Sequence, residues 1–143
     1  MKCTLIIDKN KDEEIIIYAH DRTDLINRIE KLILEKSHDL IGYNEKSIIN
    51  LSISDVYCFI VENNKIYAIT ENEKILIKKR LYEIERLLSN DFIKINQSCI
   101  INIKKIKRFD ASFAGSLMVT LKNDYKDYIS RRQLKTVKER IGF

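Results

Sequence analysis

Proline and tryptophan are absent from this 143-residue sequence, and glycine, cysteine and histidine are scarce. The three cysteines, Cys3, Cys58 and Cys99, are odd in number and far apart, which excludes a disulfide framework and favours a reduced, cytoplasmic location. The two histidines, His20 and His38, show no metal-ligand spacing, so we expect no metal site. No apolar run approaches the roughly 18 residues of a membrane span, and the first residues do not form a signal peptide.

Catalysis is a second class of function that these absences disfavour. Scattered glycines cannot form a phosphate-cradling loop, and the stretch around Gly115 and Ser116 lacks the second glycine of a nucleophile elbow. Cys58 and Cys99 alternate with apolar residues, which is typical of small core side chains rather than of nucleophiles. We therefore expect no enzymatic activity, no cofactor and no small-molecule substrate.

Charge is what the sequence has in excess, and it is unevenly distributed. Residues 1–73 contain nine Lys and Arg against fourteen Asp and Glu, whereas residues 74–143 contain seventeen against seven, which gives the net charge of +5. This asymmetry favours a polyanion such as nucleic acid as the partner of the C-terminal half. A solvated, lysine-rich surface explains the same numbers, so charge alone leaves both interpretations open.

Hydrophobic periodicity divides the chain into two unequal parts. Residues 3–8 and 14–19 are rich in β-branched side chains and predict two strands around a charged turn. Residues 21–36 follow with helical spacing. Because the pattern breaks at Gly42, we predict a small β-β-α extension over residues 1–45.

Residues 46–143 predict a strand-rich domain with two helices. A short amphipathic helix over 77–88 lies among the strands, and a last helix follows residue 130 and ends at Gly142. The sequence "ENNK" at 62–65 predicts a hairpin turn. The predicted strands are 47–53, 55–62, 65–72, 74–79, 92–95, 99–109, 116–122 and 125–130.

Two stretches of this domain carry a more specific pattern. "LYEIERLLSNDFIKINQSCIINIKKIKRF" at 81–109 follows "L-x-E-L-E-x-L-L" and then "F-x-R-I-x-x-S-x-I-V-N", and "LKNDYKDYISRR" at 121–132 follows "L-x-N-G … V-S-R-R". Together they resemble the DNA-binding domain of the LytTR family of bacterial transcription regulators, over roughly residues 46–143. Asn96 and Gln97 stand where many members have His followed by Arg, Lys or Asn, so the base preferences of relatives do not transfer.

The resemblance implies a fold class and a way of binding. The expected fold is mostly β (α+β): LytTR-type stacked antiparallel β-sheets with a short amphipathic helix and a C-terminal helix, preceded here by the β-β-α extension. The family reads double-stranded DNA with loops at one end of the domain, and it binds two imperfect direct repeats as a homodimer, one repeat per subunit.

The first 45 residues are too few for a receiver domain. They resemble the extension of small stand-alone members, which are often encoded beside a membrane protein that restrains them. A β-β-α unit of this size is not stable alone, so we expect it to pack on the DNA-binding domain or on another copy of itself.

Two arginines open the last helix, although a helix N-terminus disfavours cations by about 0.3–1 kcal/mol. If Ser130 caps this helix, Arg131 and Arg132 lie at a corner where backbone N–H groups and guanidinium groups form a phosphate or guanine site. The resemblance makes Arg132 the expected base contact. Its alternative is a salt bridge to Asp127 or Glu139.

Seven further residues are expected to contact DNA. Gln97 pairs with adenine or merely faces solvent in a turn, while Asn96 and Ser98 hold phosphate or close that turn. Basic side chains neutralise the backbone, and the hairpin turn brings a third loop. The DNA-binding residues are Arg132, Arg131, Gln97, Asn96, Ser98, Lys94, Lys135, Lys65 and Asn64. Lys104, Lys105, Lys107 and Arg108 are further candidates for backbone neutralisation, on alternating faces of one strand.

The leading interpretation is thus a sequence-specific double-stranded DNA-binding transcription regulator. The alternative is a basic protein-interaction module that binds an acidic partner or an anionic surface. RNA binding is a third interpretation, which the lack of a base-stacking aromatic signature disfavours.

Overall fold

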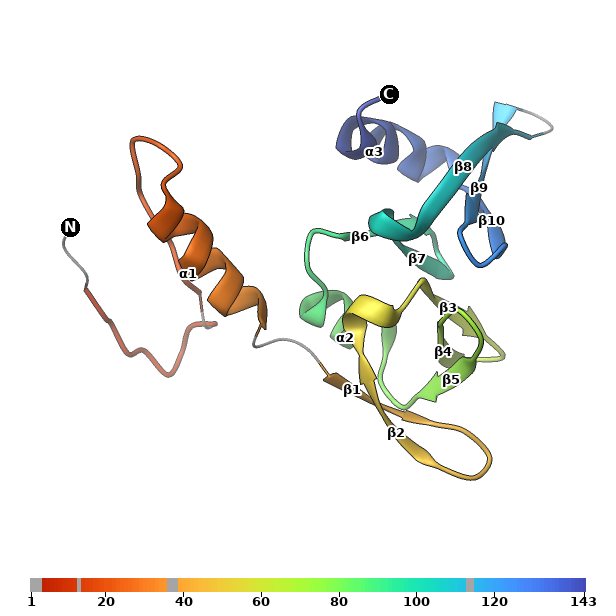
Figure 1. Ribbon diagram of the computed structural model, residues 1–143, viewed down its shortest axis with the longest axis horizontal. Coiled ribbons are helices and arrows are strands. Elements are labelled where there is room, and N and C mark those ends of the chain that lie inside the picture. Colours follow the sequence, from red (N-terminus) through yellow and green to blue (C-terminus); the bar gives the residue numbers. More distant parts are fainter. Residues whose placement is uncertain (1–3, 13, 36–38, 113–114) are drawn as a thin grey trace.

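The computed structural model describes residues 4–12, 14–35, 39–112 and 115–143 (Figure 1). It confirms the mostly β fold class, because the described residues form ten strands in two antiparallel sheets together with three α-helices. The helices are α1 (Asp24–Glu35), α2 (Leu81–Leu87) and α3 (Arg131–Ile141). Gly142 ends α3 in the left-handed conformation, as predicted, with φ of 95°.

The larger sheet has seven strands in the order β2-β1-β5-β4-β3-β7-β6. The smaller sheet has three strands in the order β10-β9-β8, and all neighbours in both sheets are antiparallel. The strands are β1 (Asp39–Tyr43), β2 (Ile48–Ser52), β3 (Cys58–Glu62), β4 (Lys65–Ile69), β5 (Lys74–Ile77), β6 (Phe92–Asn96), β7 (Cys99–Asn102), β8 (Ile106–Ala111), β9 (Leu117–Leu121) and β10 (Lys126–Ile129).

Two hydrophobic cores lie on opposite faces of the larger sheet. Side chains alternate along a strand, so Phe59 of β3 belongs to one core while its neighbour Cys58 belongs to the other. The first core includes Ile84 of α2, and the second includes Val137 of α3 together with residues of the smaller sheet. The apolar faces of α2 and α3 therefore pack against the two sides of the larger sheet.

The predicted strand over residues 99–109 is wrong in its middle. A 3₁₀ helix, Ile103–Lys105, separates β7 from β8. The buried Asn102 side chain is the cause, because it accepts a hydrogen bond from the Lys104 backbone N–H at 3.0 Å while the distant Val56 carbonyl, to which it donates at 3.0 Å, holds it in place. The alternation predicted for Lys104 and Lys105 on a strand therefore does not hold.

Strand β1 was not predicted, because Gly42 looked like a break in the pattern. Gly42 instead lies inside β1, where a Cβ atom would come within 2.2 Å of the Ile75 Cγ2 atom. Glycine is required here by close packing rather than by a turn. The domain boundary at residue 45 remains a prediction. Strand β1 precedes this boundary in the sequence but is part of the larger sheet.

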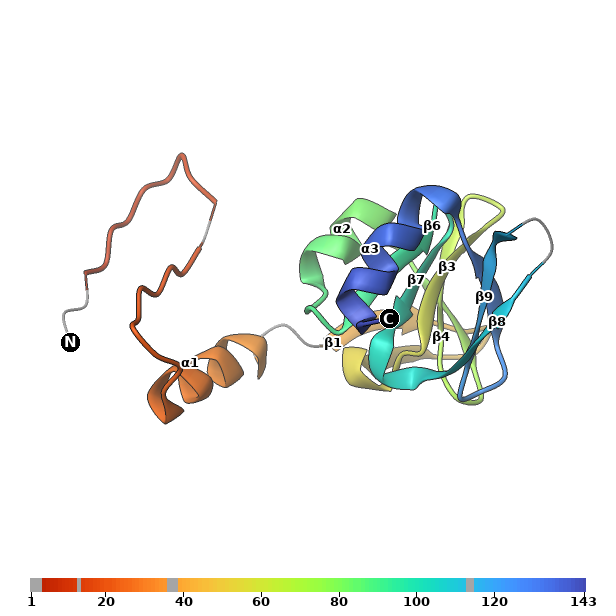
Figure 2. The same cartoon turned by 90° about the horizontal axis from the view of Figure 1, so that it is seen from above.

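The extension contains the predicted helix α1 but not the two predicted strands. Residues 4–12 and 14–23 form no strand, and in the turn at residues 9–11 the Asn10 N–H donates to Asp8 Oδ1 at 3.0 Å. A strand needs a hydrogen-bonded neighbour as well as β-branched residues, and none of the described strands pairs with this segment. Figures 1 and 2 show this segment and α1 apart from the sheets. None of the described helices is long and apolar enough to cross a membrane.

Candidate nucleic-acid interface

The β3–β4 hairpin provides the first loop of the candidate site. Asn63 and Asn64 both have positive φ, 51° and 60°, which gives the tight two-residue turn that the "ENNK" sequence predicts. Asn64 and Lys65 are exposed. Both therefore lie at a protruding tip, as the sequence interpretation requires.

The β6–β7 turn provides the second loop, and Asn96 organises it. Asn96 is 3% exposed, and its Nδ2 atom donates to the Tyr128 carbonyl at 2.9 Å and to Asp127 Oδ1 at 3.1 Å. Its Oδ1 atom accepts the Ser98 N–H at 2.8 Å. This side chain is used within the protein, so it positions the turn, while Gln97 and Ser98 are exposed at its tip.

The corner between β10 and α3 provides the third loop. Ser130 precedes the helix in an extended conformation, but its hydroxyl makes no capping hydrogen bond, which corrects the expectation that it caps α3. Arg131 and Arg132 are exposed in the first turn of α3. Among the described residues Arg132 has no ion pair with Asp127 or Glu139, so its guanidinium group is directed to solvent.

Backbone hydrogen bonds bring these three loops to one end of the domain. The Val61 N–H donates to the Ser98 carbonyl at 2.8 Å, which joins the first loop to the second. The Ser130 N–H donates to the Ile95 carbonyl at 2.8 Å, which joins the second loop to the third. We call the combined surface of residues 63–65, 97–98 and 130–132 the loop end. Figure 2 shows the turn after β3 and the start of α3 along the same edge of the domain.

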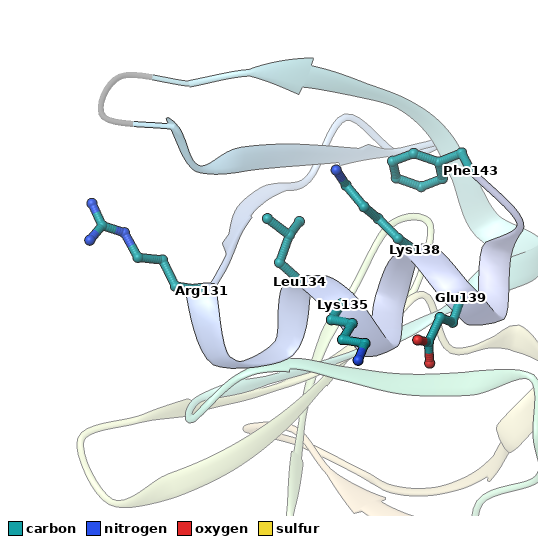
Figure 3. A pocket seen from close by; sticks show the side chains of 6 residues that line it. All are labelled: Arg131, Leu134, Lys135, Lys138, Glu139 and Phe143. Carbon is teal, nitrogen blue, oxygen red and sulfur yellow. The ribbon is translucent and has the colours of Figure 1, made fainter.

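Helix α3 extends the loop end with a row of cations. Arg131, Lys135 and Lys138 are spaced so that they lie along one side of the helix and line a shallow pocket with Leu134. Figure 3 shows Arg131 reaching past the N-terminal end of α3 and Lys138 beside Phe143 near the other end. Contact between Lys135 and the DNA backbone remains a prediction.

Lys94 is set apart from the loop end. It lies in β6 and forms an ion pair with Glu85 of α2 at 3.6 Å. This ion pair places the Lys94 side chain, which is 38% exposed, on the α2 side of the larger sheet rather than at the turn after β6. Contact between Lys94 and DNA remains a prediction.

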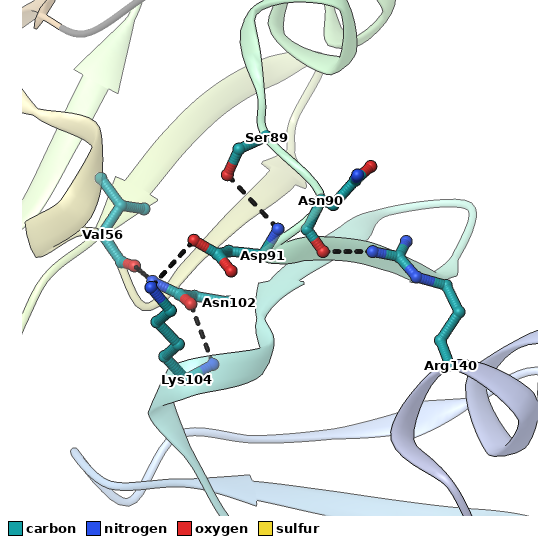
Figure 4. Close-up of polar contacts among 7 residues, drawn as sticks. All are labelled: Val56, Ser89, Asn90, Asp91, Asn102, Lys104 and Arg140. Carbon is teal, nitrogen blue, oxygen red and sulfur yellow. Dashed lines mark hydrogen bonds and ion pairs between the residues drawn. The ribbon is translucent and has the colours of Figure 1, made fainter. Parts of the chain in front are cut away.

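The lysine-rich stretch after β7 lies at the opposite end of the domain. Lys104 pairs with Asp91 at 3.2 Å and Lys107 with Asp124 at 3.2 Å, while Arg108 lies further along β8 and pairs with Asp110 at 2.9 Å. Figure 4 shows the contacts at this end, where Arg140 of α3 also donates to the Asn90 carbonyl. Lys104, Lys107 and Arg108 are balanced by carboxylates, which weakens the attraction that these three cations exert on a polyanion.

Residues 78–80, "KKR", are basic residues at the loop end that the sequence analysis did not select. Ile77 pairs with Ile66, so the end of β5 lies beside Lys65 and the first loop. All three side chains are exposed. The sequence pattern of the β4–β5 hairpin could have revealed this position, because it places residues 65 and 78 side by side. The basic run was instead assigned to the polar face of the following helix.

Cys58 and Cys99 are core residues, as predicted, and neither is exposed. A hydrogen bond between the two thiols and burial together raise the pKa of the Cys99 thiol. Burial also raises the pKa of the Tyr125 phenol nearby. Both groups stay protonated at neutral pH, which is the opposite of what a nucleophile requires.

Comparison with known proteins agrees with this geometry. Residues 46–142 match the profile of the LytTr DNA-binding domain. An uncharacterized HTH-type transcriptional regulator of Staphylococcus aureus (strain NCTC 8325 / PS 47) is 40% identical over 145 residues, covering 99% of both chains. A protein with the same description from strain MSSA476 is 39% identical over the same length. The solved LytTr DNA-binding domain of a Bacillus cereus response regulator has a TM-score of 0.70 at 21% identity and covers 74% of this chain and 98% of that chain.

Proposed function

Since the chain belongs to the LytTR DNA-binding domain family, we propose that it is a sequence-specific, double-stranded DNA-binding transcription regulator that reads DNA with the loop end. The observation that carries the proposal is the convergence of three exposed loops, joined through Ser98 and Ser130, at one end of the domain. No two α-helices are consecutive in the described part of the chain, so loops rather than a helix-turn-helix unit are the available readers.

Within the loop end, two side chains suit base reading. The guanidinium group of Arg132 can donate two hydrogen bonds to guanine, and the amide of Gln97 can pair with adenine. Both are exposed, Gln97 at the tip of the β6–β7 turn and Arg132 in the first turn of α3. Asn96 contributes indirectly, because it fixes the position of the loop that carries Gln97.

Other polar residues of the loop end suit the DNA backbone. Ser98, Asn64 and Lys65 lie at the tips of their turns, and Arg131 and Lys135 lie along α3. Contacts to phosphate fix the register of a protein on the duplex and do not depend on sequence. In the proposed complex these side chains orient the domain so that Arg132 and Gln97 reach the base edges.

The proposal extends to the assembled regulator. We place the protein in the cytoplasm, where bacterial DNA is found, and we propose that it binds two imperfect direct repeats as a homodimer. Restraint by a membrane protein encoded nearby is also a proposal, and it rests on the resemblance to small stand-alone members of the family.

Mapping of the bound surface by nuclear magnetic resonance tests the proposal. Titration of the ¹⁵N-labelled protein with duplex DNA should shift the backbone amide signals of residues 63–65, 97–98 and 130–132. The amides of the β9–β10 turn at the opposite end serve as an internal control and should not move. Shifts confined to that opposite end, or none at near-physiological salt, would rule out reading by the loop end.

The alternative, a basic module that binds an acidic partner, predicts a different result in a competition assay. Binding to one duplex would then be displaced equally well by any duplex of the same length, because the attraction depends on charge alone. A regulator of the proposed kind retains its preferred duplex in the presence of excess unrelated DNA.

A further inference from the structure

The extension holds most of the large hydrophobic side chains that this chain exposes. Ten of the sixteen exposed large hydrophobic residues in the described part of the chain lie between residues 5 and 33. They are Leu5, Ile6, Ile7, Ile15, Ile16, Ile17, Tyr18, Leu25, Leu32 and Ile33. The other six are scattered singly over residues 41–143. Such a concentration of exposed apolar side chains in one segment of the chain points to an interaction site.

Three occupants of this surface are poorly matched to it. The sheet domain offers only scattered apolar residues, so it has no complementary face for the whole segment. DNA and anionic membranes are disfavoured by charge, because residues 4–35 contain eight Asp and Glu against five Lys and Arg. A partner must therefore present an apolar surface of similar extent without a strong negative charge.

A second copy of the same segment meets these requirements. Its apolar surface is of equal extent, and its modest net charge is spread among both signs, including an ion pair between Arg22, just before α1, and Glu30 on α1. A stable interface needs about 800 Å² and 20–30 residues from each partner, which the 32 residues from 4 to 35 can provide. Pairing between copies would also satisfy the backbone groups of residues 4–8 and 14–19, which are β-branched but form no strand in the single chain.

We propose that residues 4–35 of two copies associate, with the α1 helices packed through Leu25, Leu32 and Ile33 and with the runs 5–7 and 15–17 forming strands of a shared sheet. The S. aureus relatives align with this chain over 99% of both lengths, so the extension belongs to them as well. This inference deepens the homodimer of the proposed function by naming its surface, and its test contains no DNA.

The test is the mass of the full chain by sedimentation equilibrium over a wide range of protein concentration. Wild type should have twice the 16.9 kDa of one chain. The double variant Ile6→Gln/Leu32→Gln should raise the dimer dissociation constant at least tenfold, because both side chains are more than half exposed in the single chain and become buried only in the dimer. Neither side chain packs on the sheet domain, so the thermal unfolding of that domain should be the same in the double variant as in wild type.

Ile48→Gln is the matched control, because Ile48 is 73% exposed but lies in β2, at the edge of the larger sheet. It should dimerise as wild type does. Hydrogen exchange should show protected amides at 5–7 and 15–17 in wild type and loss of that protection in the double variant. A wild type that stays monomeric, a double variant that dimerises normally, or an Ile48→Gln variant that alone loses the dimer would overturn the proposal.

Discussion

At the scale of single residues, polarity and position in the sequence do not tell which side chain faces a ligand. Asn96 and Gln97 are neighbours in a turn, and the sequence assigns both to DNA. The structure separates them, because Asn96 is buried with three hydrogen-bonded partners whereas Gln97 is exposed. Two of the three partners of Asn96, namely Asp127 and Tyr128, lie more than thirty residues away in β10, so the local pattern alone could not reveal its role.

Replacement of Asn96 by alanine is therefore predicted to affect stability and binding together. The Tyr128 carbonyl loses its side-chain donor and the Ser98 N–H loses its acceptor, which should lower the free energy of unfolding by about 1–3 kcal/mol. Urea denaturation measures this change. The exposed Asn50, which makes one hydrogen bond to Asp39, is the control, and Asn50→Ala should cost less than about 0.5 kcal/mol. Equal losses in the two variants would contradict the positioning role.

At the scale of elements, the sequence predicted most strands and all three helices, because their hydrophobic periods are clear. It failed where a distant partner decides the local structure. The 3₁₀ helix after β7 depends on Asn102 and the Val56 carbonyl, and β1 depends on the fit between Gly42 and Ile75. The two strands predicted in the extension failed for the same reason, since the single chain provides no neighbouring strand for them.

Helix α3 has cations at both ends, and these should have opposite effects on stability. Arg132 lies in the first turn, where the helix dipole disfavours it, so Arg132→Gln should raise the free energy of unfolding by about 0.3–1 kcal/mol in the absence of DNA. Arg140 lies in the last turn and donates to the Phe92 carbonyl at 3.1 Å, so Arg140→Gln should lower it. Thermal unfolding at low salt compares the two variants. A loss of stability in Arg132→Gln would show that this arginine supports the fold rather than a ligand.

At the scale of the whole molecule, the uneven charge along the sequence becomes an uneven charge in space. Exposed cations lie at the loop end and in the adjacent segment 78–80, whereas Lys104 and Lys107 at the opposite end pair with Asp91 and Asp124. The sequence showed the excess of positive charge in the second half but not this division, because the division depends on which strand ends lie together. The family pattern correctly indicated the fold and the DNA-binding class, while the individual contacts remain predictions.

This division predicts how salt affects DNA binding. Each lost phosphate contact should reduce the slope of the logarithm of affinity against the logarithm of salt concentration by about 0.9. We expect a reduction of that size for Lys65→Ala and for Lys79→Ala, whose side chains are exposed at or beside the loop end. Lys104→Ala and Lys107→Ala, at the opposite end, should keep the wild-type slope. Fluorescence anisotropy with labelled duplex DNA provides the measurement, and a uniform effect of all four substitutions would indicate a diffuse charge effect.

Selection of binding sites from a random duplex pool at near-physiological salt shows whether the loop end reads base sequence through Arg132. Wild type and Arg132→Ala are selected in parallel, with Lys104→Ala as the control. We expect wild type and the control to enrich the same repeated motif, and Arg132→Ala to lose about tenfold of its preference at one base, which lies within the roughly 1–3 kcal/mol of an arginine–guanine contact. Enrichment of the same motif with undiminished preference by Arg132→Ala, or enrichment of no motif by wild type, would contradict this expectation.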